Sequence, residues 1–198
     1  MTKMDLTGSR GRLLVVLSGL LFSFVACSLI NPRTYTAGPY RGRVIDAETK
    51  EPVIGAVVLM YWVRESPGLF MNRESFLSAE ETLTDEGGRF VVGRWPRISL
   101  IPGTWVSQPY IFIYQPGYRR CPAWCVGPPA PHEGGEGWVG AMQSGRAVFE
   151  LPRAKTRQER LEAQGGFPAA VPFKNMPALL QLVNRERLEL GLQPVGIK

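Results

Sequence analysis

The hydrophobic and polar positions divide the chain into an apolar N-terminal segment, a long region of short apolar runs, and a C-terminal region with helical spacing. The middle region alternates runs rich in Val, Ile, Phe and Tyr with turns that contain Gly, Pro and Asp, a pattern typical of strands. Residues 85–88 (Asp-Glu-Gly-Gly) predict a hairpin between the runs on either side. The expected strands cover residues 42–46, 54–62, 81–84, 89–92, 109–114 and 146–151. We therefore expect an all-β fold, most simply a β-sandwich.

After residue 152 the spacing becomes helical. Thr156 and Glu159 form a capping box that predicts a short helix, which the glycines at 165–166 would end. A second helix is expected from near Asn175 to Gly191, with an apolar stripe on one face made of Met176, Leu179, Leu180, Val183 and Leu190. Because so short a helix is marginal in water by itself, the stripe must dock, either on the β-domain or on a second protein.

The N-terminus has the build of an export signal. Basic residues at Lys3, Arg10 and Arg12 precede the apolar run 13–26, which is followed at once by Cys27. The run is short for a permanent transmembrane helix, which takes about 20 apolar residues. Residues 24–27 (Phe-Val-Ala-Cys) resemble the lipobox of bacterial lipoproteins, although Phe24 stands where Leu is usual. We expect residues 1–26 to be a signal peptide and Cys27 to carry lipid. A retained helix, or cleavage elsewhere, is the alternative.

Composition and charge narrow the class of protein. The chain has 22 Gly and 17 Pro, which favours short strands joined by turns over an all-helical fold. The formal net charge is only +6, and basic residues are interspersed with acidic ones, so we do not expect nucleic acid as a partner. Residues 27–39 have no hydrophobic period and suit a tether between lipid and domain.

Three segments, in order, resemble the carboxypeptidase regulatory-like domain. Residues 42–58 carry its opening pattern, residues 84–90 are similar to its T-D-x-x-G-x-F turn, and residues 111–118 to its later strand, which ends in Gly-Tyr. The positions that match the opening pattern are Gly42, Val44, Asp46, Thr49, Pro52, Val53, Gly55, Ala56 and Val58.

The resemblance covers about residues 40–151 and implies a seven-stranded Greek-key sandwich of the transthyretin-like type, with a short C-terminal helical appendage at 152–198. Insertions relative to the family lie at about 64–80 and 119–145, where loop-borne function is expected. The predicted inter-sheet core contains Phe90, Ile111, Ile113 and Val148. In the carboxypeptidases this domain has no zinc ligands of its own, so the resemblance implies no chemistry.

The chain offers little for catalysis or metal binding. Its one histidine, His132, lies among Pro and Gly, whereas zinc peptidases and serine hydrolases need several convergent groups that include His. We expect no metal site, no cofactor and no enzymatic activity. A surface position is the expected role of His132.

The cysteines and the aromatic residues supply the remaining candidates. With Cys27 assigned to lipid, Cys121 and Cys125 form an even pair that is most simply a disulfide, and two free buried thiols are the alternative. Trp105, Trp124, Trp138 and Tyr118 could bind a glycan or a protein, since such aromatics are enriched at binding hot spots. They could equally pack the loops of a small sandwich.

These features predict a non-catalytic lipoprotein of a bacterial cell envelope, anchored to a membrane that faces the periplasm. In a Gram-negative cell this would be the outer membrane. Its partners would be the membrane, through the lipid, and another envelope component. A carbohydrate-binding module that uses its loop tryptophans is the main alternative, and an enzyme of unknown type is a weaker one.

Overall fold

The computed structural model describes residues 35–68, 72–93, 95–97, 101–128 and 137–196. The signal peptide expected at 1–26, Cys27 and His132 lie outside the described residues. The strands are β1 (Tyr35–Ala37), β2 (Tyr40–Asp46), β3 (Val57–Ser66), β4 (Arg73–Leu83), β5 (Arg89–Val92), β6 (Trp95–Arg97), β7 (Trp105–Val106), β8 (Tyr110–Tyr114) and β9 (Ala147–Leu151). The helices are α2 (Gly137–Gln143), α3 (Arg157–Ala163) and α4 (Pro177–Glu189), with a 3-10 turn η2 (Phe173–Asn175) before α4.

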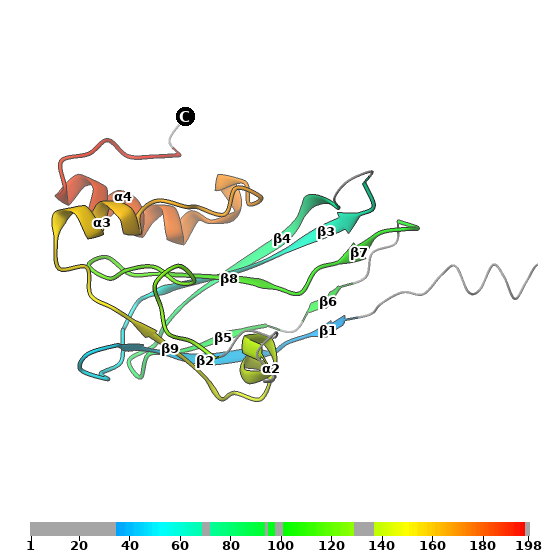
Figure 1. The fold of residues 1–198 in the computed structure, drawn as a ribbon, viewed down its shortest axis with the longest axis horizontal. Coiled ribbons are helices and arrows are strands. Elements are labelled where there is room, and N and C mark those ends of the chain that lie inside the picture. Colours follow the sequence, from blue (N-terminus) through cyan, green and yellow to red (C-terminus); the bar gives the residue numbers. More distant parts are fainter. Residues whose placement is uncertain (1–34, 69–71, 94, 98–100, 129–136, 197–198) are drawn as a thin grey trace, which may run out of the picture.

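The chain is largely β, as its alternating pattern predicts, and its strands form two main sheets. One sheet has the order β5-β2-β9, in which β2 pairs antiparallel with β5 and parallel with β9. In the other, β3 pairs antiparallel with β4 on one side and with both β7 and β8 on the other. A separate two-stranded ribbon joins β1 to β6. Figure 1 shows the two main sheets as stacked layers.

Strands β3 and β4 form a long two-stranded arm. Their pairing runs from Val57 opposite Leu83 to Ser66 opposite Arg73, with a bulge between Trp62 and Val63. The expected insertion at 64–80 therefore lies largely within paired strand, and β3 extends beyond the residues 54–62 that alternation predicts. Strand β7 covers the outer part of the arm, where Trp105 lies opposite Glu65.

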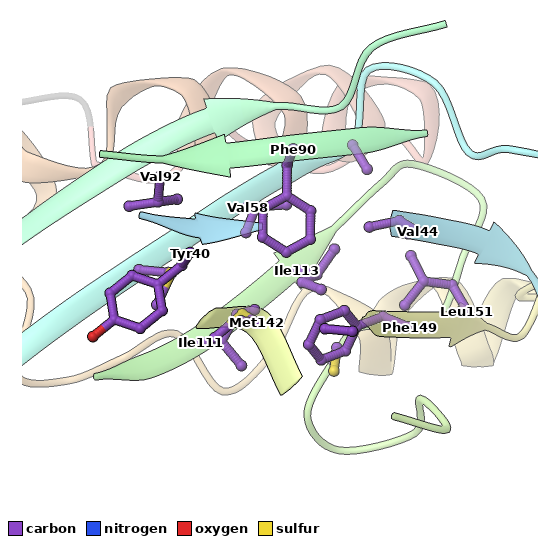
Figure 2. Packing of buried hydrophobic residues seen from close by; sticks show 14 of the residues in the cluster. Tyr40, Val44, Val58, Phe90, Val92, Ile111, Ile113, Met142, Phe149 and Leu151 are labelled. Carbon is purple, nitrogen blue, oxygen red and sulfur yellow. The ribbon is translucent and has the colours of Figure 1, made fainter. Parts of the chain in front are cut away.

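The core lies between the two sheets. Alternate residues of β2, β5 and β9 point at alternate residues of β3 and β8, and Met142 of α2 enters from one side (Figure 2). Phe90 and Phe149 meet with ring centroids 6.1 Å apart. At about 25 cal/mol per Å² of apolar surface, burying such rings is a leading contribution to stability. Phe90, Ile111 and Ile113 are all buried, as predicted.

The prediction that Val148 belongs to the core is wrong. Val148 is 40% exposed, whereas its neighbours Ala147 and Phe149 are buried. Successive side chains of a strand point to opposite faces, so a shift of one residue inverts the assignment. The register places Ala147 beside Gly42 on the inner face, which gives that face to residues 147, 149 and 151.

The predicted hairpin at residues 81–92 is also wrong. The turn at 85–88 forms as expected: the N–H of Gly88 donates to the carbonyl of Asp85, and the N–H of Asp85 to the carbonyl of Arg89, at 2.8 and 2.9 Å. However, β4 pairs with β3 and β5 pairs with β2, so this turn carries the chain from one sheet to the other. The local turn chemistry was sound, but it does not determine which strands pair.

The C-terminal helices form a third layer on the outer face of the β3 sheet (Figure 1). Helix α3 begins at the predicted capping box, in which the N–H of Glu159 donates to Thr156 and the Glu159 carboxylate accepts the N–H of Thr156. The buried face of α4 rests on outward residues of β3 and β8, so the predicted stripe docks on the β-domain. The buried residues of this second core are Val57, Leu59, Phe112, Tyr114, Ala163, Val171, Met176, Leu179 and Val183. Among the described residues, no helix has the length and apolar character needed to cross a bilayer.

Candidate functional site

The segment that follows β8 ties the two sheets together on one side of the core. Cys121 exchanges backbone hydrogen bonds with Ile113 of β8, at 3.0 and 3.2 Å. Val126 does the same with Glu150 of β9, at 2.7 and 3.1 Å. Within the short intervening loop, Cys121 and Cys125 lie at disulfide-bonding distance, with Cα atoms 4.9 Å apart. The predicted pairing of these two cysteines is thus geometrically satisfied.

A pocket of about 350 Å³ opens where this loop, α2 and the ends of both sheets meet. Its walls come from both sheets, the cysteine loop and α2, so only the folded chain assembles it. The lining residues are Tyr110, Ile111, Cys121, Pro122, Cys125, Gly127, Pro128, Trp138 and Phe149. Three aromatic rings and the cysteine pair make the pocket predominantly apolar, the character usual of sites for small ligands.

Tyr110 supplies the one phenol of the lining. Its ring stacks on Tyr61 with centroids 5.0 Å apart and an interplanar angle of 15°, which fixes the ring. Partial burial, together with the nearby carboxylates of Glu74 and Glu65, raises the pKa of Tyr110 above its ordinary value of 10.0. The hydroxyl therefore stays protonated near neutral pH, and it donates a long hydrogen bond to Oε1 of Glu74 at 3.5 Å. The lining can stack on a ring or hold an apolar group, but it offers no acid or base that titrates near neutrality.

Of the predicted aromatic candidates, Trp138 lines the pocket and the other three do not. Trp124 lies against two guanidinium groups, those of Arg119 and Arg120, at 4.6 and 4.7 Å from the ring centroid. Arg119 in turn approaches Glu162 of α3 at 3.6 Å. Trp124 therefore joins the loop to the helical layer, which is the packing role that the sequence left open.

Trp105 and Tyr118 lie elsewhere. Trp105 is partly buried on β7, along the arm formed by β3 and β4. The hydroxyl of Tyr118 donates to Asp46 at 3.1 Å, and Arg153 lies over the Tyr118 ring at 5.5 Å. The four candidates thus do not form one surface.

Asp46 is the centre of a buried polar cluster. Its carboxylate accepts the N–H groups of Glu48 and Thr49 at 2.8 and 3.0 Å, the Tyr118 hydroxyl, and Nε of Arg153 at 2.6 Å. Burial alone would raise the pKa of this carboxyl, but the four hydrogen bonds outweigh it and hold the pKa well below its ordinary value. A fully engaged carboxylate that is ionised at neutral pH stabilises the turn after β2 and is unsuited to proton transfer there.

A second buried carboxylate, Glu186, lies between the helices and β8. It accepts hydrogen bonds from the Tyr114 hydroxyl, from the N–H of Gly117 at 3.0 Å and from Nε of Arg160 at 2.6 Å. Burial, and then the bond to Glu186, raise the pKa of Tyr114. Glu186 and Tyr114 are shut away from solvent, Arg160 is partly exposed, and together they fasten the third layer to the sheet.

The sequence signals that could have pointed to the pocket are Tyr110, Phe149 and the loop closed by the cysteine pair. The order of the strands brings these residues together. Among the described residues, no group of three or more His, Cys, Asp or Glu side chains is placed to hold a metal ion. The lipid on Cys27 and the surface position of His132 remain predictions, since both residues lie outside the described part of the chain. Comparison of the chain with protein-family models, with curated proteins and with solved structures found no match.

Proposed function

We propose that this chain is a membrane-anchored lipoprotein of a bacterial cell envelope whose β-domain binds another envelope component without catalysing a reaction. The single observation that carries the binding role is the aromatic pocket lined by Trp138, Tyr110 and Phe149. Its size suits a ring or an apolar side chain presented by a partner, and its walls come from elements that pack firmly on the core.

Contacts between segments of the regulatory-like pattern support the family resemblance. Gly42 lies so close to the Phe90 ring that a Cβ would meet it, and the Tyr118 hydroxyl reaches Asp46. These contacts join the first segment to the second and to the third. A three-stranded and a four-stranded sheet around one core agree with a seven-stranded transthyretin-like sandwich, and we propose the Greek-key form of that fold.

The experiment is capture of partners by the full-length protein from its native membrane after mild crosslinking. Trp138→Ala and Tyr110→Leu each alter one wall of the pocket, and both should lose the partner that the parent chain captures. Trp124→Ala is the matched control, because Trp124 is partly buried like Trp138 but lies against Arg119 and Arg120 outside the pocket. Capture that survives both pocket variants, with melting temperatures near that of the parent, contradicts the proposal.

A glycan is the second candidate ligand, favoured by the presence of Trp138 and the donor hydroxyl of Tyr110 in one pocket. Soluble fragments of envelope glycan should then quench tryptophan fluorescence of the parent protein and of Trp124→Ala, but not of Trp138→Ala. Replacing His132 with Ala should alter neither glycan binding nor partner capture. A loss of function in that variant would restore the enzyme alternative.

The anchor has its own test. Cells that produce the chain should incorporate labelled fatty acid into it, and Cys27→Ser should abolish the label. Cys125→Ser serves as the control for loss of a cysteine. Equal labelling of the parent chain and Cys27→Ser would exclude lipidation at Cys27 and leave the binding role of the pocket untouched.

A further inference from the structure

The outer face of the β5-β2-β9 sheet carries a cluster of exposed arginines, here called the arginine face. Arg41 and Arg43 lie two residues apart on β2, Arg89 lies on β5, and Arg146 immediately precedes β9. The period of two along a strand puts Arg41 and Arg43 on the side opposite the buried Tyr40 and the inward Gly42. Together the four arginines line a shallow groove of about 340 Å³.

The register places like charges against each other. Arg43 is directly opposite Arg89 in the antiparallel pair of β2 and β5. Such a pair is destabilising by itself, and within the chain Nε of Arg43 donates to the carbonyl of Gly87 at 2.9 Å, an acceptor without net charge. Within the described part of the chain, no carboxylate lies within ion-pair distance of Arg41, Arg43 or Arg89. The folded chain thus maintains positive charge that an external anion would neutralise.

Two of the acidic groups near this face are already engaged, whereas Glu86 of the neighbouring turn is exposed. Glu150 of β9 pairs with Lys50 at 2.8 Å. At the turn that precedes β5, Oδ1 of Asp85 accepts the backbone N–H groups of Gly87 and Arg89, at 2.9 and 2.8 Å. The arginine face therefore keeps a net positive charge. The turn before β5 lies at one end of this face.

Exposed apolar side chains lie among the arginines. Val91 of β5 and Val148 of β9 are 53% and 40% exposed and line the same groove. Basic residues mixed with apolar ones are typical of surfaces that sit in the headgroup region of a membrane. The helical layer lies on the far side of the other sheet, so it leaves the arginine face uncovered (Figure 1).

The length of the proposed tether would keep this face close to a membrane. From Cys27 to Tyr35 there are eight residues, which span at most about 29 Å when fully extended. The chain then enters β2 at Tyr40, directly before Arg41. A lipid on Cys27 would therefore hold the arginine face within reach of the bilayer surface.

We propose that the arginine face binds the phosphate-bearing headgroups of anionic lipids in the membrane that holds the anchor. This inference rests on the proposed lipid anchor for its location, and on the geometry of β2, β5 and β9 for its chemistry. A flat, open groove with several cations suits many phosphates at a surface better than one small soluble anion. The electrostatic contact is a second attachment that orients the domain, with the helical layer directed away from the membrane.

The test is flotation of the full-length protein with vesicles of phosphatidylcholine alone or mixed with phosphatidylglycerol. The anchor should give equal partitioning of all variants onto neutral vesicles, and the arginine face should add binding to anionic vesicles only. The double variant Arg41→Gln with Arg89→Gln should lose about 25-fold of the anionic partitioning, at about fivefold for each arginine. The charge-preserving variant Arg41→Lys with Arg89→Lys should retain it, and so should Lys174→Gln with Arg185→Gln, which removes two exposed charges from the helical layer.

The outcomes separate the inference from the anchor. If the protein does not bind neutral vesicles but still binds anionic vesicles, the result contradicts the anchor and supports the arginine face. Equal binding of parent and glutamine variants to anionic vesicles overturns the inference, whatever the neutral vesicles show. Competition by inorganic phosphate at constant ionic strength would mean a small soluble ligand and would also overturn it. Higher salt should weaken the anionic excess.

Discussion

The hydroxyl of Tyr114 donates a hydrogen bond to Glu186, whose side chain is fully buried, so strand β8 and helix α4 share one polar contact inside an otherwise apolar interface. Glu186→Ala removes the acceptor and leaves Tyr114 and Arg160 facing a cavity. We expect it to lower the free energy of unfolding by about 3–5 kcal/mol. Tyr114→Phe removes one of three donors and should cost about 1–2 kcal/mol.

Urea denaturation of the parent and variants measures both effects. Glu189→Ala is the control, because Glu189 is exposed and pairs with the same Arg160 at 2.8 Å. A surface pair of this kind contributes at most about 1 kcal/mol. Equal costs for Glu186→Ala and Glu189→Ala would show that the buried carboxylate does not hold α4 in place.

Asp46 predicts a dependence of stability on pH. Its pKa is lower in the folded chain than in the unfolded chain, where it is near 3.8. The resulting stabilisation is therefore complete well above pH 3.8 and is lost as the pH falls below that value. Asp46→Asn should be less stable than the parent by about 2 kcal/mol or more at neutral pH, and the difference should narrow toward pH 2.

Unfolding curves collected across this pH range test the prediction, with Glu51→Gln as a control for loss of a nearby exposed carboxylate. A gap between parent and Asp46→Asn that stays constant down to pH 2 would argue against an ionised Asp46 as its source.

Two glycines with the same backbone conformation give a matched pair. Gly55 and Gly88 both have φ of +70°, but a Cβ at Gly55 meets open space, whereas one at Gly88 would collide with the carbonyl oxygen of Val44. Gly55→Ala should cost about 1–2 kcal/mol for the left-handed conformation alone. Gly88→Ala should cost about 3 kcal/mol or more, because the sheet must also shift. Thermal melts of the two variants that coincide would contradict this packing of the turn against β2.

The pairing of Cys121 and Cys125 is tested by alkylation. In protein purified without reductant, the alkylating reagent should modify neither cysteine until a reductant is added. The loop closed is only a few residues long, so reduction should lower the free energy of unfolding by about 2 kcal/mol at most on entropic grounds. Because both cysteines line the pocket, reduction should have a larger effect on ligand capture than on the free energy of unfolding. Immediate modification of both would identify free thiols.

Local features of the sequence predicted local structure well. The strand predicted at residues 109–114 forms as β8, which begins one residue later at Tyr110, and the Thr156 and Glu159 capping box starts α3 as expected. Each of these depends on residues within a few positions of one another. The α4 stripe docks on the β-domain, one of the two partners that the sequence left open.

The failures concern partners that are distant in sequence. Whether Val148 or Phe149 faces the core depends on how β9 sits beside β2, and the turn at 85–88 forms whether or not its flanking strands pair. The arginine face has a local signal, the alternation of Arg41 and Arg43 with Tyr40, Gly42 and Val44 on β2. Its third member, Arg89, joins only through the register of β5. Strand order likewise separates Trp105 and Trp124 from the pocket that Trp138 lines.

The parallel pairing of Gly42 with Ala147 has a consequence for the order of events during synthesis. A chain that emerges N-terminus first exposes β2 long before β9, since more than half of its length separates the two. Until β9 arrives, one edge of β2 is open, and the buried side of the sheet lacks Phe149 and Leu151. Closing so long a loop is slow relative to forming the local β3-β4 hairpin. The β5-β2-β9 sheet can therefore close only after β9 has been synthesised, when about three quarters of the chain has already emerged.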